Sequence, residues 1–269
     1  MSTALRLALV LITLACIALF LLHPWWFPVP ASAQAPALDH GLKTALWLLG
    51  GLFIAGQIVL ALFLGLKRSN SSSRHWYGNW RLEIGWTAAI AAIFFWFNVS
   101  GGGLWSRMTS ADVHSGALRV EVTGVQFQWY FRYPGPDGAF GRVDAPKFAR
   151  PDEGNPLGLD PGDPAGKDDI VSSTLVLPVD HPVELDLRAQ DVIHSVFIPA
   201  MRLKQDAVPG MDIRTRFTPT QIGNYELVCS QLCGLGHYRM KATVRVVSEE
   251  EFKYWLKSQT AGRENPGMK

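Results

Sequence analysis

Two apolar stretches separated by a basic loop constrain the fold of this chain more than any other feature. The first, residues 44–66, is broken only by Gln57, and the second, residues 84–99, extends through three glycines to Trp105. A helix that crosses a membrane requires roughly 20 predominantly apolar residues. The first stretch is long enough, and the second becomes long enough with its extension. The sequence therefore predicts a transmembrane helical hairpin within residues 34–105.

The loop between the two stretches indicates the orientation of the hairpin. It carries Lys67, Arg68, Arg74 and Arg81 and no acidic residue before Glu83. Basic residues in a short loop mark the cytoplasmic side of a membrane. We therefore expect a multi-pass protein of a bacterial-type plasma (inner) membrane, with its C-terminal half on the outer, periplasmic side.

Residues 1–33 have the features of a secretory signal peptide. A basic residue, Arg6, precedes the apolar residues 7–22, and the small residues Ala31-Ser32-Ala33 follow. This order predicts cleavage after Ala33. The alternative is an uncleaved additional transmembrane helix, although the apolar run is shorter than the roughly 20 residues that a span requires.

The second half of the chain has the composition of a water-soluble domain. Only two acidic residues, Asp39 and Glu83, precede residue 106. Charged residues make up 18% of the whole chain and the formal net charge is +2. These values exclude a disordered protein and a protein that coats nucleic acid. Membrane lipid is the expected environment of the first half, and no nucleic-acid partner is expected.

Short runs rich in Val, Thr, Phe and Tyr begin after Gly116 and predict a mainly β domain over residues 106–250. The predicted strands cover residues 118–123, 126–133, 172–179, 183–189, 214–218, 223–228 and 241–247. Several short strands with turn residues between them favour an antiparallel sandwich or barrel. Proline and acidic residues predict a long surface insertion at 134–170. Residues 251–269 are predicted to form a C-terminal helix and tail.

The chemically most reactive side chains are concentrated near the end of this domain. They are Cys229, Cys233, His237 and Met240, with His194 further upstream. Thiolate, imidazole and thioether ligands together favour copper over magnesium or calcium. A mononuclear blue-copper site needs only one thiolate. The second thiolate therefore favours a two-copper centre in which both sulfurs bridge the metals.

Three other interpretations of these residues stay open. Cys229 and Cys233 would form an ordinary disulfide in an oxidising compartment, although that leaves His194 and His237 unexplained. A structural zinc site would use two Cys and two His, although that leaves Met240 unexplained. The third is a dithiol that is redox-active or delivers copper.

The series of residues resembles the CuA site of subunit II of haem–copper oxidases, the subunit of cytochrome c oxidase that receives electrons. Residues 82–87 resemble the start of the second helix of that family. Residues 126–130, 191–195 and 204–210 resemble its aromatic cluster, its first copper His segment and its loop facing subunit I. The resemblance implies a two-helix hairpin followed by a cupredoxin-like β-barrel.

The resemblance also implies the role of each metal ligand. His194 and His237 would each terminate one copper, Cys229 and Cys233 would bridge the two, and Met240 and the backbone carbonyl of Gln231 would be axial ligands. The family usually has Glu at the position of Gln231, and its carboxylate helps to hold magnesium at the boundary with subunit I. Because Gln231 lacks this carboxylate, magnesium is not predicted. No catalytic residue is expected in this chain.

Four further residues take roles from the resemblance. Glu83 would mark the mouth of a proton path into subunit I, although a carboxylate at a helix N-terminus is also favourable by itself. Phe127 occupies the place of the usual Trp through which electrons arrive, which leaves Trp129 and Tyr130 as further candidates. For each aromatic residue taken singly, core packing is the simpler explanation.

The function implied is electron relay. Cytochrome c would reduce the binuclear copper centre, which would pass electrons to the haem and CuB of subunit I. There, oxygen is reduced to water and protons are translocated. The expected partners are subunit I, the other oxidase subunits and cytochrome c. Two alternatives stay open: a CuA subunit of a nitric oxide reductase-type enzyme, and a membrane-anchored copper chaperone.

Overall fold

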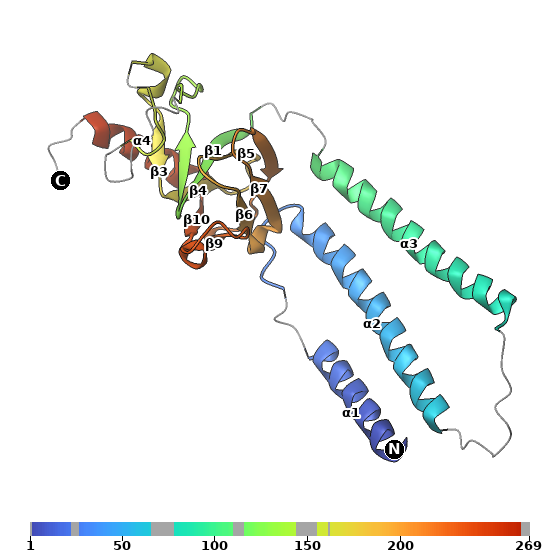
Figure 1. The fold of residues 1–269 in the computed structure, drawn as a ribbon. Coiled ribbons are helices and arrows are strands. Elements are labelled where there is room, and N and C mark those ends of the chain that lie inside the picture. Colours follow the sequence, from blue (N-terminus) through green and yellow to red (C-terminus); the bar gives the residue numbers. More distant parts are fainter. Residues whose placement is uncertain are drawn as a thin grey trace. The chain divides into compact units, whose positions relative to one another are not determined.

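The computed structural model divides into two compact units (Figure 1). It describes residues 2–22, 27–65, 78–109, 116–143, 155–160 and 162–264. One unit consists of Met1–Pro28 and Ala37–Arg107, and the other of Val29–Pro36 and Met108–Lys269. The short segment Val29–Pro36, which includes the end of the predicted signal peptide, belongs to the second unit.

The first unit is helical, with α1 (Ser2–Leu21), α2 (Ala35–Gly65) and α3 (Trp80–Thr109). Within α2 and α3, Ala35–Phe63 and Trp80–Gly103 are long and apolar enough to cross a membrane, and the side chains there are not buried within the protein. Both predicted apolar helices are thus present, and each is longer than predicted, with polar residues in the added turns. Most of the predicted basic loop, residues 66–77, lies outside the described residues.

The helix α1 coincides with the apolar core of the predicted signal peptide. Its apolar part, Leu7–Leu21, is shorter than the two candidate spans. A helix of this kind suits either a signal peptide or an additional membrane segment, so cleavage stays a prediction at this point.

The second unit contains ten described strands in two sheets. They are β1 (Leu118–Val125), β2 (Gln128–Tyr133), β3 (Ile170–Ser172), β4 (Thr174–Pro178), β5 (Val183–Ala189), β6 (His194–Ile198), β7 (Leu203–Ala207), β8 (Ile213–Phe217), β9 (Gly223–Cys229) and β10 (Lys241–Val247). One sheet has the order β3-β2-β1-β5-β8 and the other β4-β10-β9-β6-β7. The predicted mainly β, two-sheet architecture is therefore correct.

The structure corrects the strand prediction in two respects. Strands β6 and β7 were not predicted, and residues 172–179 hold the end of β3 and all of β4. The expectation of a purely antiparallel arrangement is wrong, because β1 pairs with β5 and β4 with β10 in parallel. Parallel neighbours require a long connection, and here β2, β3 and β4 lie between β1 and β5 in the chain.

The core lies between the two sheets. In β1, Val120 and Val122 are fully buried in it, while Glu121 and Thr123 alternate with them and lie on the opposite face. A buried tyrosine of β2 links the two sheets. The hydroxyl group of Tyr133 donates to the Val176 carbonyl of β4 at 2.9 Å and accepts from the Val176 N–H at 2.7 Å.

The proline-rich insertion is attached to the outer face of the first sheet rather than only solvated. The Arg132 side chain is buried there and pairs with Glu121 and with Asp169 Oδ2, the latter at 3.0 Å. Asp169 lies at the end of the insertion, and Leu157, inside it, is 3% exposed. Residues 144–154 and 161 of the insertion lie outside the described residues.

The chain ends in the helix α4 (Glu249–Glu264). The hydroxyl group of Ser248 accepts a hydrogen bond from the Glu251 N–H at 3.2 Å, which caps the first turn. The ring of Trp255 packs edge-on against Tyr133 at a centroid distance of 5.0 Å. The helix therefore covers one end of the β domain (Figure 1).

Candidate metal centre

The predicted metal ligands come from two places in the second sheet. His194 is the first residue of β6, Cys229 is the last residue of β9, and Cys233, His237 and Met240 lie in the loop between β9 and β10. Pairing of Val196 with Cys229 brings β6 beside β9. At the base of the loop, the Cys229 N–H donates to the Met240 carbonyl at 3.0 Å. The sheet thus closes the loop and places it beside His194.

The donor atoms of His194, His237 and Met240 lie close to the Sγ atoms of Cys229 and Cys233. Cys229 Sγ lies 3.9 Å from Cys233 Sγ and 3.9 Å from His194 Nδ1. Cys233 Sγ lies 3.6 Å from His237 Nδ1 and 3.7 Å from Met240 Sδ. Each thiol therefore has its own imidazole neighbour.

The backbone of Gln231 contributes a further donor. Its carbonyl oxygen lies 3.2 Å from Cys229 Sγ, while the residue as a whole is exposed. The carbonyl group, and not the amide side chain, therefore faces the sulfur atoms.

The two thiols are free and largely shielded from water. Their Sγ–Sγ distance of 3.9 Å is far longer than a disulfide bond of about 2.0 Å. Burial, followed by the neighbouring Cys229 thiol, raises the pKa of Cys233 to about 11. Two adjacent buried thiols deprotonate readily only when a cation replaces their protons. The cluster therefore fits a bound soft cation.

The imidazole of His194 is held in a defined orientation. Its Nε2–H donates to Asp191 Oδ1 at 2.8 Å, which leaves Nδ1 directed at Cys229. The indole ring of Trp129 packs edge-on at a centroid distance of 5.8 Å. A Cβ at Gly124 would come within 2.8 Å of His194 Cδ2, so only glycine leaves room for the ring. A histidine ligand oriented by a carboxylate is a common feature of metal sites.

Asp191 stays ionised because its hydrogen bonds outweigh its burial. Burial raises its pKa, but the Gln126 N–H, the His194 ring and the Val192 N–H stabilise the carboxylate and give a net lowered pKa. The Gln126 and Val192 bonds are both 2.7 Å long. Residues 191–195 were predicted to carry the first copper His, and no role was predicted for Asp191. An acidic residue three positions before a metal-binding His is the sequence signal that could have identified Asp191.

Phe127 lies against the ligand loop. A Cβ at Gly236 would come within 2.5 Å of Phe127 Cγ, and one at Gly234 within 3.2 Å of Phe127 Cε1. The adjacent Gln126 side chain donates through Nε2 to the Cys233 carbonyl at 2.5 Å. The turn between β1 and β2 therefore supports the loop directly.

The other two predicted aromatic residues lie on opposite faces of β2. Trp129 is 1% exposed, belongs to the core and contacts His194. Tyr130 is on the other face, where its hydroxyl group donates to Gln128 Oε1 at 3.3 Å. Among the described contacts, Trp129 and Phe127 reach the cluster and Tyr130 does not.

Glu83 belongs to the helical unit. It lies in the first turn of α3, where a carboxylate is favoured by the helix dipole. Its predicted role at a proton path stays a prediction.

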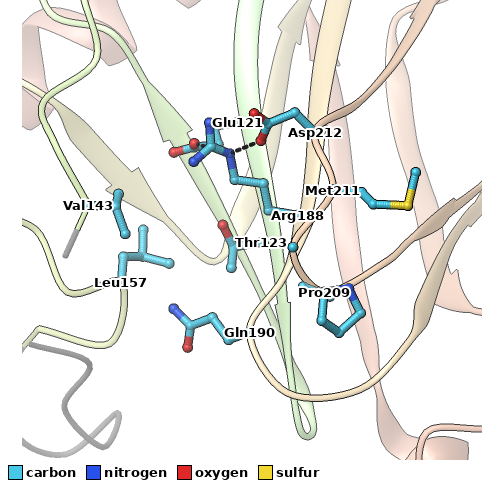
Figure 2. A pocket seen from close by; sticks show the side chains of 11 residues that line it. Glu121, Thr123, Val143, Leu157, Arg188, Gln190, Pro209, Met211 and Asp212 are labelled. Atoms are coloured by element: carbon cyan, nitrogen blue, oxygen red, sulfur yellow. Dashed lines mark ion pairs between the residues drawn. The ribbon is translucent and has the colours of Figure 1, made fainter. Parts of the chain in front are cut away.

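A separate pocket of about 370 Å³ lies on the outer face of the first sheet (Figure 2). There, Arg188 Nε lies 2.7 Å from Glu121 Oε1 and 3.2 Å from Asp212 Oδ1. These charged groups pair with one another, so the pocket presents no metal ligand set.

Within the described part of the chain, the ligand atoms of His194, Cys229 and Cys233 lie within 4.8 Å of one another.

The fold and the donors together define a class of protein. A two-sheet β domain whose thiol, imidazole and thioether donors come from the start of β6, the end of β9 and the loop between its last two strands is a cupredoxin-like copper domain. The soft-to-borderline donor set agrees with copper.

Comparisons with known proteins support this class. Residues 118–247 match the family described as "Cytochrome C oxidase subunit II, periplasmic domain". The chain is 32% identical to the alternative cytochrome c oxidase subunit 2 of Bradyrhizobium diazoefficiens, over 95% of this chain and 92% of that protein. It is 30% identical to cytochrome c oxidase subunit 2 of Cereibacter sphaeroides, over 78% of this chain and 71% of that protein.

A solved structure is also similar. It is the periplasmic domain of subunit II of cytochrome oxidase (CoxB) of Bradyrhizobium japonicum, with 29% identity and a TM-score of 0.39 over 54% of this chain and 94% of that chain.

The chain belongs to the cytochrome c oxidase subunit II family. The expected CuA copper centre is confirmed at the level of the family and of the His/Cys/Cys cluster. The protein is part of an oxidoreductase complex with other oxidase subunits, and it is anchored in a membrane with its copper domain on the outer side.

Proposed function

We propose that this chain transfers electrons from reduced cytochrome c to the haem of oxidase subunit I. One observation carries the proposal: two buried thiols lie 3.9 Å apart, and each has its own imidazole neighbour. These residues would hold a pair of copper ions, whereas a mononuclear site would use only one of the thiols.

The distances support one role for each ligand. His194 would terminate the copper nearer Cys229, and His237 the copper nearer Cys233. Met240 Sδ lies 3.7 Å from Cys233 Sγ, whereas the Gln231 carbonyl lies beside Cys229. These two donors, both thiolates and the two imidazoles would together hold the copper pair.

The protein's contribution is a ligand shell whose shape is fixed by hydrogen bonds and whose thiols, His194 and Met240 are buried. When bound, the copper pair accepts and releases one electron at a time. Asp191 holds His194 in place, and the bond from Cys229 N–H to the Met240 carbonyl closes the loop. His194 and Met240 are at most 1% exposed. A shell that is already fixed by such contacts changes little between redox states, which favours fast electron transfer.

Phe127 is the best-placed aromatic residue for electron arrival. It is partly buried and lies on Gly236 in the ligand loop, whereas Trp129 is enclosed in the core. We place the docking face of cytochrome c over Phe127. The electron then leaves for subunit I, where oxygen is reduced to water and protons are translocated, with Glu83 at the mouth of the proton path.

The proposed membrane arrangement has α2 and α3 both crossing a bacterial inner membrane. The basic residues between them would face the cytoplasm, which places the copper domain in the periplasm. Reporter fusions in the loop near residue 70 and at the C-terminus test this arrangement, and a cytoplasmic C-terminal reporter would contradict it.

Copper stoichiometry and electron paramagnetic resonance of the purified complex test the proposed function. We expect two coppers per chain and one unpaired electron shared equally between them, with oxygen consumption driven by reduced cytochrome c. Cys229→Ser or Cys233→Ser should abolish the shared signal, because one bridge cannot hold both metals.

Two other outcomes would replace the proposal. A single exchangeable Cu(I) per chain would indicate a copper chaperone. A two-copper centre in a complex that reduces nitric oxide but not oxygen would indicate a nitric oxide reductase-type enzyme.

A further inference from the structure

Most of the segment Val29–Pro36 precedes α2 in the chain, yet the whole segment belongs to the copper domain. Ala31 is fully buried and is part of the hydrophobic core, and Ser32 is 1% exposed. These are two of the three residues that, by sequence alone, form the predicted cleavage site.

The backbone of the segment forms hydrogen bonds with two distant parts of the domain. Ala31 N–H donates to the Ala200 carbonyl at 2.8 Å, and its carbonyl accepts from the Thr220 N–H at 2.9 Å. Ala33 N–H donates to the Thr218 carbonyl at 2.9 Å. The segment therefore lies between the β6–β7 connection and the end of β8 and bonds to both.

The side chain of Ser32 adds a further bond. Its hydroxyl group donates to the Met201 carbonyl at 2.8 Å, in a buried position. Its backbone forms an antiparallel bridge with Pro219. A side-chain bond and three backbone bonds thus hold the same three residues.

Cleavage after Ala33 would remove all of these contacts. The carbonyl groups of Ala200, Met201 and Thr218 and the N–H of Thr220 would lose these partners. Buried backbone groups that lose their partners destabilise a fold strongly. The domain is therefore built to contain the segment.

We propose that Val29–Pro36 is a permanent part of the copper domain and is retained in the mature protein. The Ala31-Ser32-Ala33 sequence is then a structural segment and not a processing site. Any N-terminal processing would occur before Val29. The inference does not depend on the proposed electron transfer.

The mass of the mature subunit tests this directly. Ala33 is exposed in the structure, so Ala33→Leu fits the fold, yet it removes the small residue that a signal peptidase requires before its cut. We expect the native subunit, purified from membranes, to contain residues 29–33. We also expect Ala33→Leu to change its mass only by the difference between the two side chains. A native N-terminus at Gln34, with a longer subunit accumulating in Ala33→Leu, would overturn the proposal.

Thermal unfolding of the purified full-length subunit provides a second test. Ser32→Ala removes the bond to Met201, and we expect its Tm to fall by roughly 2–4 °C, the shift typical of losing one buried hydrogen bond in a protein of this size. Ser258→Ala is the matched control, because its hydroxyl group donates to the Trp255 carbonyl at 2.7 Å on the exposed side of α4. Equal Tm values for Ser32→Ala and the unmodified protein would contradict retention of the segment.

Discussion

The ring of Phe127 lies so close to Gly236 that a Cβ on the glycine would come within 2.5 Å of ring atom Cγ. Real Cβ contacts are essentially never shorter than 3.0 Å. Gly236 directly precedes His237, one of the residues proposed to bind copper. The turn before β2 and the ligand loop therefore fix one another's positions, and this contact exists only because residue 236 has no side chain.

Gly236→Ala should disturb the copper centre. The added methyl group must displace the Phe127 ring or the loop, at a cost of about 1–3 kcal/mol in the free energy of unfolding. We expect an altered copper spectrum and a lower midpoint of chemical unfolding. Leu235→Ala is the control, because Leu235 is 98% exposed in the same loop. An unchanged copper spectrum in Gly236→Ala would show that the position of the Phe127 ring does not affect the ligand loop.

Asp191→Asn should weaken copper binding while leaving the fold intact. The amide accepts the His194 hydrogen bond without a full charge, and its NH₂ group faces the Gln126 N–H that the carboxylate now binds. Loss of such a partner typically lowers metal affinity by about 10–100-fold. Competition with a copper chelator measures this change. Asp212→Asn, which removes an exposed carboxylate paired with Arg188, is the control and should leave the affinity unchanged.

Gln231→Ala should leave the copper spectrum nearly unchanged, because the carbonyl group faces Cys229 and the residue is exposed. Met240→Leu provides the contrast. It removes a buried donor 3.7 Å from Cys233 Sγ, so we expect a shifted reduction potential with the two-copper signal retained. Spectroscopy and redox titration of both variants measure these effects. Loss of copper in Gln231→Ala would show that the side chain is a ligand.

Manganese substitution tests the prediction that Gln231 does not support a magnesium site. An amide oxygen carries no charge and is a weaker partner for a hard dication than a carboxylate. In the assembled complex, Gln231→Glu should increase bound Mn(II), detected by its own resonance. Stoichiometric, tight manganese in the unmodified complex would contradict the prediction.

Arg132→Met should destabilise the copper domain strongly. It leaves the buried Glu121 and Asp169 without their Arg132 ion pairs, and breaking a buried pair typically costs about 3–5 kcal/mol. Chemical unfolding of the purified protein measures the loss. Arg142→Met is the control, since this 77%-exposed side chain pairs with Asp160 and Asp163 at the surface, where such pairs contribute about 0–1 kcal/mol. Similar losses in both variants would show that the insertion is not anchored through Arg132.

The sequence determined those features that depend on neighbouring residues. The two long apolar helices follow from the length of the apolar runs, which α2 and α3 reproduce. Cys229, Cys233, His237 and Met240 are close in the chain, so one short loop is enough to bring them together. The combination of thiol, imidazole and thioether side chains is by itself enough to indicate copper.

Only the tertiary structure decided the features that depend on distant pairing. His194 reaches Cys229 because β6 pairs with β9, and β6 itself was not predicted. The parallel pairing of β1 with β5 likewise depends on how the whole sheet assembles. Ala31-Ser32-Ala33 suits both a cleavage site and a buried segment. Most hydrogen bonds of this segment are made by backbone N–H and carbonyl groups, which are the same in every residue. The side-chain sequence therefore does not show which parts of the domain the segment binds.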